Sequence, residues 1–105
     1  MTTQQGVEEK FAEFPMKRPV AGHSWLVYLL RCADGTLYCG STNNLERRLA
    51  QHNGDIPGGA RYTRSRKPLQ VLAACACEDR SSALRLEALV KKHRKGEKAS
   101  FLLSQ

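Results

Sequence analysis

Short apolar segments separated by turn signals dominate the chain after about residue 23. Residues 25–30, Trp-Leu-Val-Tyr-Leu-Leu, are apolar or aromatic throughout, which predicts a buried strand. The turn signal Asp34-Gly35 follows, and residues 36–41 are predicted to form the returning strand of a β-hairpin. Residues 69–77 are a second run of small and apolar side chains and predict a third strand.

A helix is predicted directly after the hairpin. The polar residues 42–44 suit the start of a helix, and Leu45 and Leu49 then lie four residues apart on one face. This helix is expected to end near residues 53–54. The Gly- and Pro-containing residues 55–68 are expected to form a loop.

Two more helices are predicted toward the end of the chain. One covers residues 82–93, with Asp79 or Ser81 as its capping residue, and a shorter one covers residues 97–103. The order is therefore strand, strand, helix, strand, helix, helix. It predicts an α+β domain with a three-stranded, largely antiparallel sheet flanked by helices.

Charge distinguishes the first residues from the rest. Residues 1–22 show no strand or helix periodicity, so we expect a flexible N-terminal extension there and one domain over residues 23–105. Acidic and basic side chains balance within the extension, so the domain carries the whole net charge of +7. A basic domain favours nucleic acid as its partner, although charge alone leaves an acidic protein or an anionic membrane surface open.

Composition indicates an ordinary globular protein, with 41% hydrophobic and 26% charged residues in a chain of 105. No apolar run approaches the roughly 20 residues that a membrane span requires, and the first residues lack the pattern of a secretory signal. We therefore expect a cytoplasmic location. None of the cysteines forms a Cys-x-x-Cys pair, so all are expected to be buried thiols: Cys32, Cys39, Cys75 and Cys77.

The length of the hairpin turn decides whether Tyr28 and Tyr38 share a face of the sheet. A two-residue turn would send the two phenols to opposite faces. A three-residue turn over residues 33–35 pairs Leu30 with Tyr38 and Tyr28 with Gly40, and the phenols then share a face. The same register separates the first two cysteines, which disfavours a zinc site built from all four.

Three further side chains are candidates for chemistry. Arg48 and His52 lie four residues apart on one helix face, where an arginine can bind phosphate and a histidine can exchange a proton. A solvated surface pair is the alternative. Glu87 is a lone carboxylate among basic residues, and it either pairs with Lys91 at i+4 or binds a hard divalent cation. The basic segment 61–67, with Tyr62 interleaved, suits phosphate contacts or is a solvated loop.

The order and spacing of these residues resemble the GIY-YIG nuclease family. Val27-Tyr28-Leu29 and Tyr38-Cys39-Gly40 correspond to the two family triplets in altered form, and residues 41–52 match the following strand-to-helix segment. Residues 84–91 match the later helix that carries the family glutamate. Residues 58–63 add similarity to a small stand-alone bacterial branch and to junction-resolving nuclease subunits.

The resemblance implies a metal-dependent endonuclease that hydrolyses DNA phosphodiester bonds in repair or recombination. We expect the protein to be a monomer. Glu87 would hold Mg²⁺ or Mn²⁺ against the scissile phosphate, and Arg48 would stabilise charge on the phosphoryl group. Tyr28, assisted by His52, would deprotonate or position the attacking water, and Tyr38 would share in the proton relay or orient the phosphate.

The resemblance covers about residues 23–103, with two departures. Many family members carry an asparagine after the last helix region, whereas no asparagine follows Asn53 here. The chain also has no appended DNA-binding domain, so its own surface or a protein partner, for which there is no direct signal, must select the substrate. A catalytically weak nucleic-acid-binding module of the same fold is the alternative function. The residues expected to contact nucleic acid are Arg61, Tyr62, Arg64, Arg66, Lys67 and Lys91.

Overall fold

The computed structural model describes residues 16–17 and 25–105, which form a four-stranded sheet in the order β1-β4-β2-β3. The strands are β1 (Met16–Lys17), β2 (Trp25–Arg31), β3 (Leu37–Thr42) and β4 (Gln70–Cys77). The central strand β2 pairs antiparallel with both β3 and β4, which confirms the predicted three strands. The short β1 pairs parallel with β4 and was not predicted. The rest of the predicted N-terminal extension lies outside the described residues.

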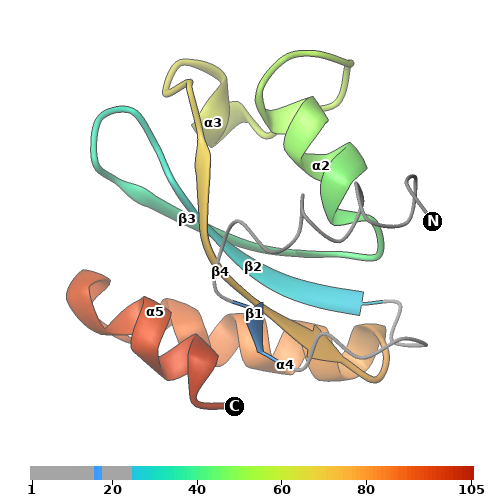
Figure 1. Ribbon diagram of the computed structural model, residues 1–105, viewed down its shortest axis with the longest axis vertical. Coiled ribbons are helices and arrows are strands. Elements are labelled where there is room, and N and C mark those ends of the chain that lie inside the picture. Colours follow the sequence, from blue (N-terminus) through green and yellow to red (C-terminus); the bar gives the residue numbers. More distant parts are fainter. Residues whose placement is uncertain (1–15, 18–24) are drawn as a thin grey trace, which may run out of the picture.

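Helices cover both faces of this sheet. Their bounds are α2 (Leu45–His52), α3 (Arg61–Arg64), α4 (Arg80–Lys91) and α5 (Lys95–Leu103). Figure 1 shows α2 and α3 above the sheet and α4 and α5 below it. The three predicted helices and the α+β class are confirmed, whereas the loop prediction was wrong for α3, because a four-residue helix is too short to leave a periodic pattern. None of the helices among the described residues is both long and apolar enough to cross a bilayer.

Side chains cap the two helices that carry the candidate residues. The side-chain oxygen of Asn44 accepts a hydrogen bond from Arg47 N at 3.0 Å at the start of α2. Asp79 does the same for Ser82 N at 2.8 Å at the start of α4, so Asp79 is the cap and not Ser81. These bonds satisfy backbone donors that a helix start leaves unpaired, and they fix where each helix begins.

The alternation of β2 divides the core between the two faces. Val27 and Leu29 are fully buried against α4 and α5, while Tyr28 and Leu30 are buried on the side of α2. The four cysteines are buried free thiols, as predicted. The sheet therefore separates an entirely apolar core from one that contains a phenol.

The hairpin turn has the predicted three-residue form. Cys32 N donates to Thr36 O at 2.8 Å, and Gly35 adopts a positive φ of 85°, which glycine tolerates without strain. Leu30 pairs with Tyr38 and Tyr28 pairs with Gly40, so the two phenols share the α2 face. Cys32 and Cys39 lie in the two opposite cores, also as predicted.

Candidate active site

Tyr28 occupies the centre of the sheet face beneath α2 and is 1% exposed. Its neighbours across the strands are Gly40 on β3 and Ala74 on β4, which leave space for the ring. A Cβ atom added to Gly40 would lie only 2.5 Å from Tyr28 Oη. The glycine of the second triplet is therefore required here for close approach and not for an unusual φ.

A chain of hydrogen-bonding side chains extends from this phenol into the helical layer. Tyr28 Oη lies 2.9 Å from His52 Nε2, and His52 Nδ1 lies 2.9 Å from Thr63 Oγ1. Thr63 Oγ1 donates to the carbonyl oxygen of Ala60 at 3.0 Å. His52 and Thr63 are the two buried polar residues of the described chain, at 1% and 0% exposed. The alternative of a solvated surface histidine is therefore excluded for His52.

Burial sets the charge state of this pair. Loss of solvent raises the pKa of Tyr28 to about 12, and the nearby Arg48 guanidinium offsets only part of that effect. Loss of solvent, together with the positive charge of Arg48, lowers the pKa of His52 to about 4. At neutral pH the site therefore holds a neutral phenol hydrogen-bonded to a neutral imidazole.

Arg48 lies one helical turn before His52 and is held in place by two acceptors. Its Nη1 atom donates to Gln51 Oε1 at 2.9 Å and to the carbonyl oxygen of Gly58 at 2.7 Å. The second bond ties α2 to the loop that follows it. A partly buried guanidinium beside two tyrosines is a strong site for an anion such as a phosphodiester.

Aromatic rings connect the buried phenol to the surface. The Tyr38 ring centroid lies 6.4 Å from that of Tyr28 and 5.1 Å from that of His52. On its outer side Tyr38 lies 5.9 Å from Tyr62 of α3, which is 38% exposed. The predicted two-tyrosine site is thus extended by a third ring from the basic segment.

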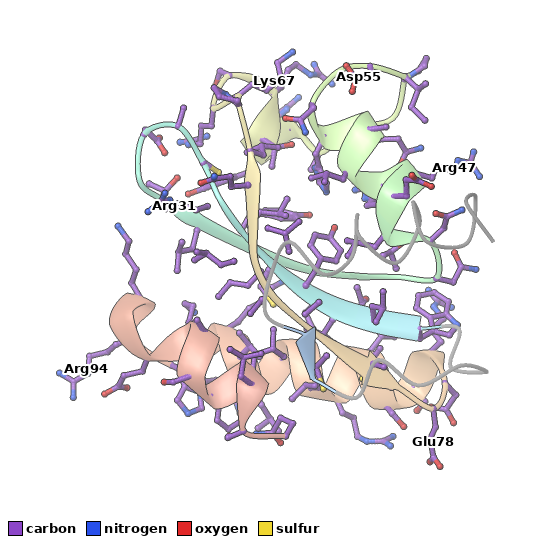
Figure 2. All side chains as sticks on the ribbon, in the orientation of Figure 1. Arg31, Arg47, Asp55, Lys67, Glu78 and Arg94 are labelled. Atoms are coloured by element: carbon purple, nitrogen blue, oxygen red, sulfur yellow. The ribbon has the colours of Figure 1, made fainter. Side chains whose placement is uncertain are left out.

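The predicted nucleic-acid residues of the 61–67 segment differ in their surroundings. The Arg66 guanidinium lies 4.0 Å from the centre of the Tyr62 ring and forms an ion pair with Asp34 of the hairpin turn at 3.0 Å. It therefore also ties this segment to the hairpin. Lys67 lies at the α2 and α3 end of the molecule (Figure 2), with its amine close to Gly54 in the loop after α2. Three basic side chains of the segment are exposed: Arg61, Arg64 and Lys67.

Glu87 comes from the other layer of the fold. It lies on α4, its side chain is 17% exposed, and Oε2 accepts an ion-pair bond from Lys91 Nζ at 2.7 Å, the predicted i+4 contact. Burial is the main cause of the raised pKa values of Tyr28 and Cys39, and the negative charge of Glu87 adds to both. The structure therefore gathers Tyr28, Tyr38, Arg48 and His52 on one face, and the charge of Glu87 on α4 acts on Tyr28.

A divalent cation fits this arrangement as a sparsely coordinated ion. Among residues 16–17 and 25–105 no three His, Cys, Asp or Glu side chains lie close enough together to hold a metal. Magnesium, however, commonly binds through one or two carboxylates, several waters and the oxygens of a substrate phosphate. The partly exposed carboxylate of Glu87 would be such a single ligand.

Thr63 is the site residue that the sequence analysis missed. It lies eleven residues from His52, in a segment without periodicity, so no spacing rule connects the two. The only signal is its position at the end of Gly58-Gly59-Ala60-Arg61-Tyr62-Thr63, the segment that resembles one branch of the family.

Comparison with known proteins identifies the family. The GIY-YIG catalytic domain model matches residues 24–99. A UPF0213 protein of Nitratidesulfovibrio vulgaris is 50% identical over 82 residues, which cover 78% of this chain and 73% of that protein. A UPF0213 protein of Lactiplantibacillus plantarum is 43% identical over 90 residues, covering 84% and 87% of the two chains.

A solution NMR structure of a UPF0213 protein from Bacillus halodurans is 33% identical, covers 77% of this chain and 84% of its own, and superposes with a TM-score of 0.47. The family match extends from the hairpin to α5, so it includes every candidate catalytic residue. The chain therefore belongs to the GIY-YIG family of nuclease-type catalytic domains, alongside the small UPF0213 proteins.

Proposed function

We propose that the protein is a divalent-metal-dependent endonuclease that hydrolyses DNA phosphodiester bonds. The observation that carries the proposal is the buried hydrogen bond of 2.9 Å between Tyr28 and His52, with the Arg48 guanidinium beside it. A buried phenol paired with a neutral base and next to a fixed cation is suited to moving a proton beside an anion. Similarity of residues 58–63 to junction-resolving nuclease subunits favours DNA repair or recombination as the setting.

The pKa of about 12 makes Tyr28 a poor resting phenolate, so its proton needs an acceptor. In the proposed step Tyr28 Oη takes a proton from the attacking water while its own proton passes to His52. The water oxygen forms a bond to phosphorus, the bond from phosphorus to the leaving oxygen breaks, and that oxygen takes a proton from solvent. His52 ends the step as an imidazolium.

The low pKa of His52 opposes proton uptake in the free protein, and substrate relieves that opposition. Burial contributes most to the lowered pKa, and the positive charge of Arg48 contributes next. A phosphodiester anion bound at Arg48 would neutralise the second contribution, so that His52 becomes a better acceptor when substrate is present. His52 would therefore accept a proton readily only when a substrate phosphate is bound.

Arg48 and Glu87 would act on the phosphate itself. Arg48 would donate hydrogen bonds to the phosphoryl oxygens as charge builds on them, and Tyr38 would help to orient the same group. Glu87 would hold Mg²⁺ or Mn²⁺, and such an ion acts as a Lewis acid that stabilises the leaving oxygen. Holding the ion requires Glu87 to exchange the Lys91 ammonium for the cation.

The basic surface beside the site is the proposed DNA contact. Lys91 on α4 and the exposed side chains near α3 come from the two opposite layers of the fold and carry part of the net charge of +7. All proposed catalytic residues come from one chain, so we propose that a monomer acts on DNA in the cytoplasm. The proposed contacts are Arg61, Tyr62, Arg64, Arg66, Lys67 and Lys91.

A nicking assay with supercoiled plasmid and branched oligonucleotides, with Mg²⁺ or Mn²⁺, tests the proposal. Arg48→Ala and Glu87→Ala should each reduce the cleavage rate by about 10²-fold or more, since Arg48 would contact the developing charge and Glu87 would hold the ion that stabilises it. Arg47→Ala and Glu97→Ala are matched controls, because both side chains are exposed on helices, and they should cleave like the wild type. Cleavage that persists in EDTA, or in both site variants, would refute the proposal.

A DNA-binding module that cleaves poorly is the second candidate. The ion pair of 2.7 Å between Lys91 and Glu87 favours it, because an ammonium already neutralises the proposed metal ligand. The missing family asparagine after Asn53 points the same way. Salt-sensitive DNA binding without cleavage, at any concentration of either metal, would identify this second function.

A further inference from the structure

We infer that Thr63 is a positioning residue that fixes the tautomer of His52 and thereby the direction in which Tyr28 passes its proton. The inference rests on the proposed function for its catalytic meaning, but the tautomer itself is a property of the free protein. The tautomer follows from the donors and acceptors in the buried series of hydrogen bonds from Ala60 to Tyr28. The three side chains in this series of hydrogen bonds, Tyr28, His52 and Thr63, are each at most 1% exposed.

The count begins at Thr63, whose hydroxyl has a single proton. That proton points to the carbonyl oxygen of Ala60 at 3.0 Å, an atom that can only accept. The contact of 2.9 Å between Thr63 Oγ1 and His52 Nδ1 therefore needs its proton from the imidazole. Neutral His52 then carries its hydrogen on Nδ1 and presents the lone pair of Nε2 to Tyr28.

The opposite end of the chain gives the same answer independently. The Arg48 guanidinium beside the phenol has no acceptor atom, so it cannot take the phenol proton. His52 Nε2, at 2.9 Å from Oη, is the acceptor within hydrogen-bond reach of that proton. The other tautomer would leave this buried proton without an acceptor and would place the oxygens of Thr63 and Ala60 against each other at 3.0 Å.

The same arrangement serves both charge states of His52. When Nε2 accepts the phenol proton, the imidazolium still donates from Nδ1 to Thr63 Oγ1, so no bond in the chain has to rearrange. Thr63 therefore acts through His52 and touches neither the water nor the phosphate. Its role corresponds to that of any group that holds a catalytic imidazole in one tautomer by accepting from its far nitrogen.

Long-range ¹H–¹⁵N NMR on the free, uniformly labelled protein tests the tautomer without DNA or metal. The wild type should show His52 with Nδ1 protonated and Nε2 unprotonated at neutral pH. Thr63→Ser keeps the acceptor and should keep this pattern. Thr63→Val removes the acceptor at nearly constant volume and should give a mixed or reversed pattern. Thr36→Val is the matched control, because that hydroxyl bonds to Asp34 in the hairpin turn instead.

Cleavage assays on the same variants complete the test. Thr63→Val should lower the rate by about 10²-fold while Thr63→Ser stays within about threefold of the wild type, since proton transfer contributes about 10²–10⁴-fold to such reactions. A wild-type His52 protonated on Nε2, or a Thr63→Val protein with unchanged tautomer and rate, would overturn the inference. If His52 is protonated on Nδ1 in the wild type and this pattern changes in Thr63→Val, but the protein never cleaves DNA, the tautomer assignment is supported and only the proposed function is refuted.

Discussion

Replacing Gly40 with alanine places a methyl group against the phenol of Tyr28. The added Cβ would lie 2.5 Å from Tyr28 Oη and 2.7 Å from Cζ, whereas ordinary contacts of this kind begin at 3.4 Å. The ring would have to move by about 0.9 Å, the difference between 3.4 Å and 2.5 Å. Tyr28 is 1% exposed, so its neighbours would have to shift with it.

The expected cost has two parts. Overpacking of a buried site typically costs about 1–3 kcal/mol, and loss of the Tyr28–His52 hydrogen bond adds roughly 1 kcal/mol. We therefore expect Gly40→Ala to lower the free energy of unfolding by about 2–4 kcal/mol. Cleavage should fall by about 10²-fold, because the phenol no longer lies within hydrogen-bond reach of His52.

Urea denaturation and the nicking assay measure the two effects. Gly96→Ala is the matched control: a Cβ there meets nothing within 4 Å in α5, and helix propensity predicts a gain of up to about 1 kcal/mol. In the double variant Gly40→Ala with Tyr28→Phe the closest contact disappears, so stability should recover in part while cleavage stays low. Wild-type stability and cleavage in Gly40→Ala would refute the close packing of Gly40 against Tyr28.

Three other predictions concern the same face of the sheet. Tyr28→Phe should reduce cleavage by about 10²–10⁴-fold, yet leave DNA affinity in a filter-binding assay unchanged, because the phenol is proposed to move a proton and not to hold DNA. Urea denaturation should show the free energy of unfolding falling by up to about 3 kcal/mol as pH drops from 6.5 toward 4, because His52 has a pKa near 6.5 in the unfolded chain and about 4 in the folded protein. Above pH 6.5 this contribution is fully present. The same dependence of stability on pH in His52→Gln would contradict it. Asn44→Ala should lower the unfolding free energy by about 1 kcal/mol in thermal denaturation through loss of the α2 cap, whereas Asn43→Ala, one residue before the cap, should not.

Local rules were sufficient for the part of the site that lies on the hairpin and on α2. The turn length fixed the register, the register placed Tyr28 and Tyr38 on one face, and i+4 spacing placed Arg48 one turn before His52. Each of these inferences depends on residues close together in the chain. They also predicted that Tyr28 would face Gly40, which the pairing of β2 with β3 confirms.

Contacts between distant segments could not be predicted in this way. Thr63 reaches His52 only because the loop after α2 folds back over the sheet, and Arg66 reaches Asp34 across thirty-two residues. The two residues of β1 give no alternation to detect. The position of Glu87 in the opposite layer follows from how α4 packs on β2 and β3, which no local pattern determines.

All three tyrosines of the chain belong to one cluster, since Tyr38 contacts both Tyr28 and Tyr62. The only tryptophan, Trp25, lies apart from them at the start of β2, with the Arg80 guanidinium 6.0 Å from the centre of its ring. Tyrosine and tryptophan signals therefore report on two different regions of the protein. Biosynthetic incorporation of fluorotyrosine would give a ¹⁹F spectrum in which every signal comes from the candidate site, while tryptophan fluorescence would report on the far end of the sheet.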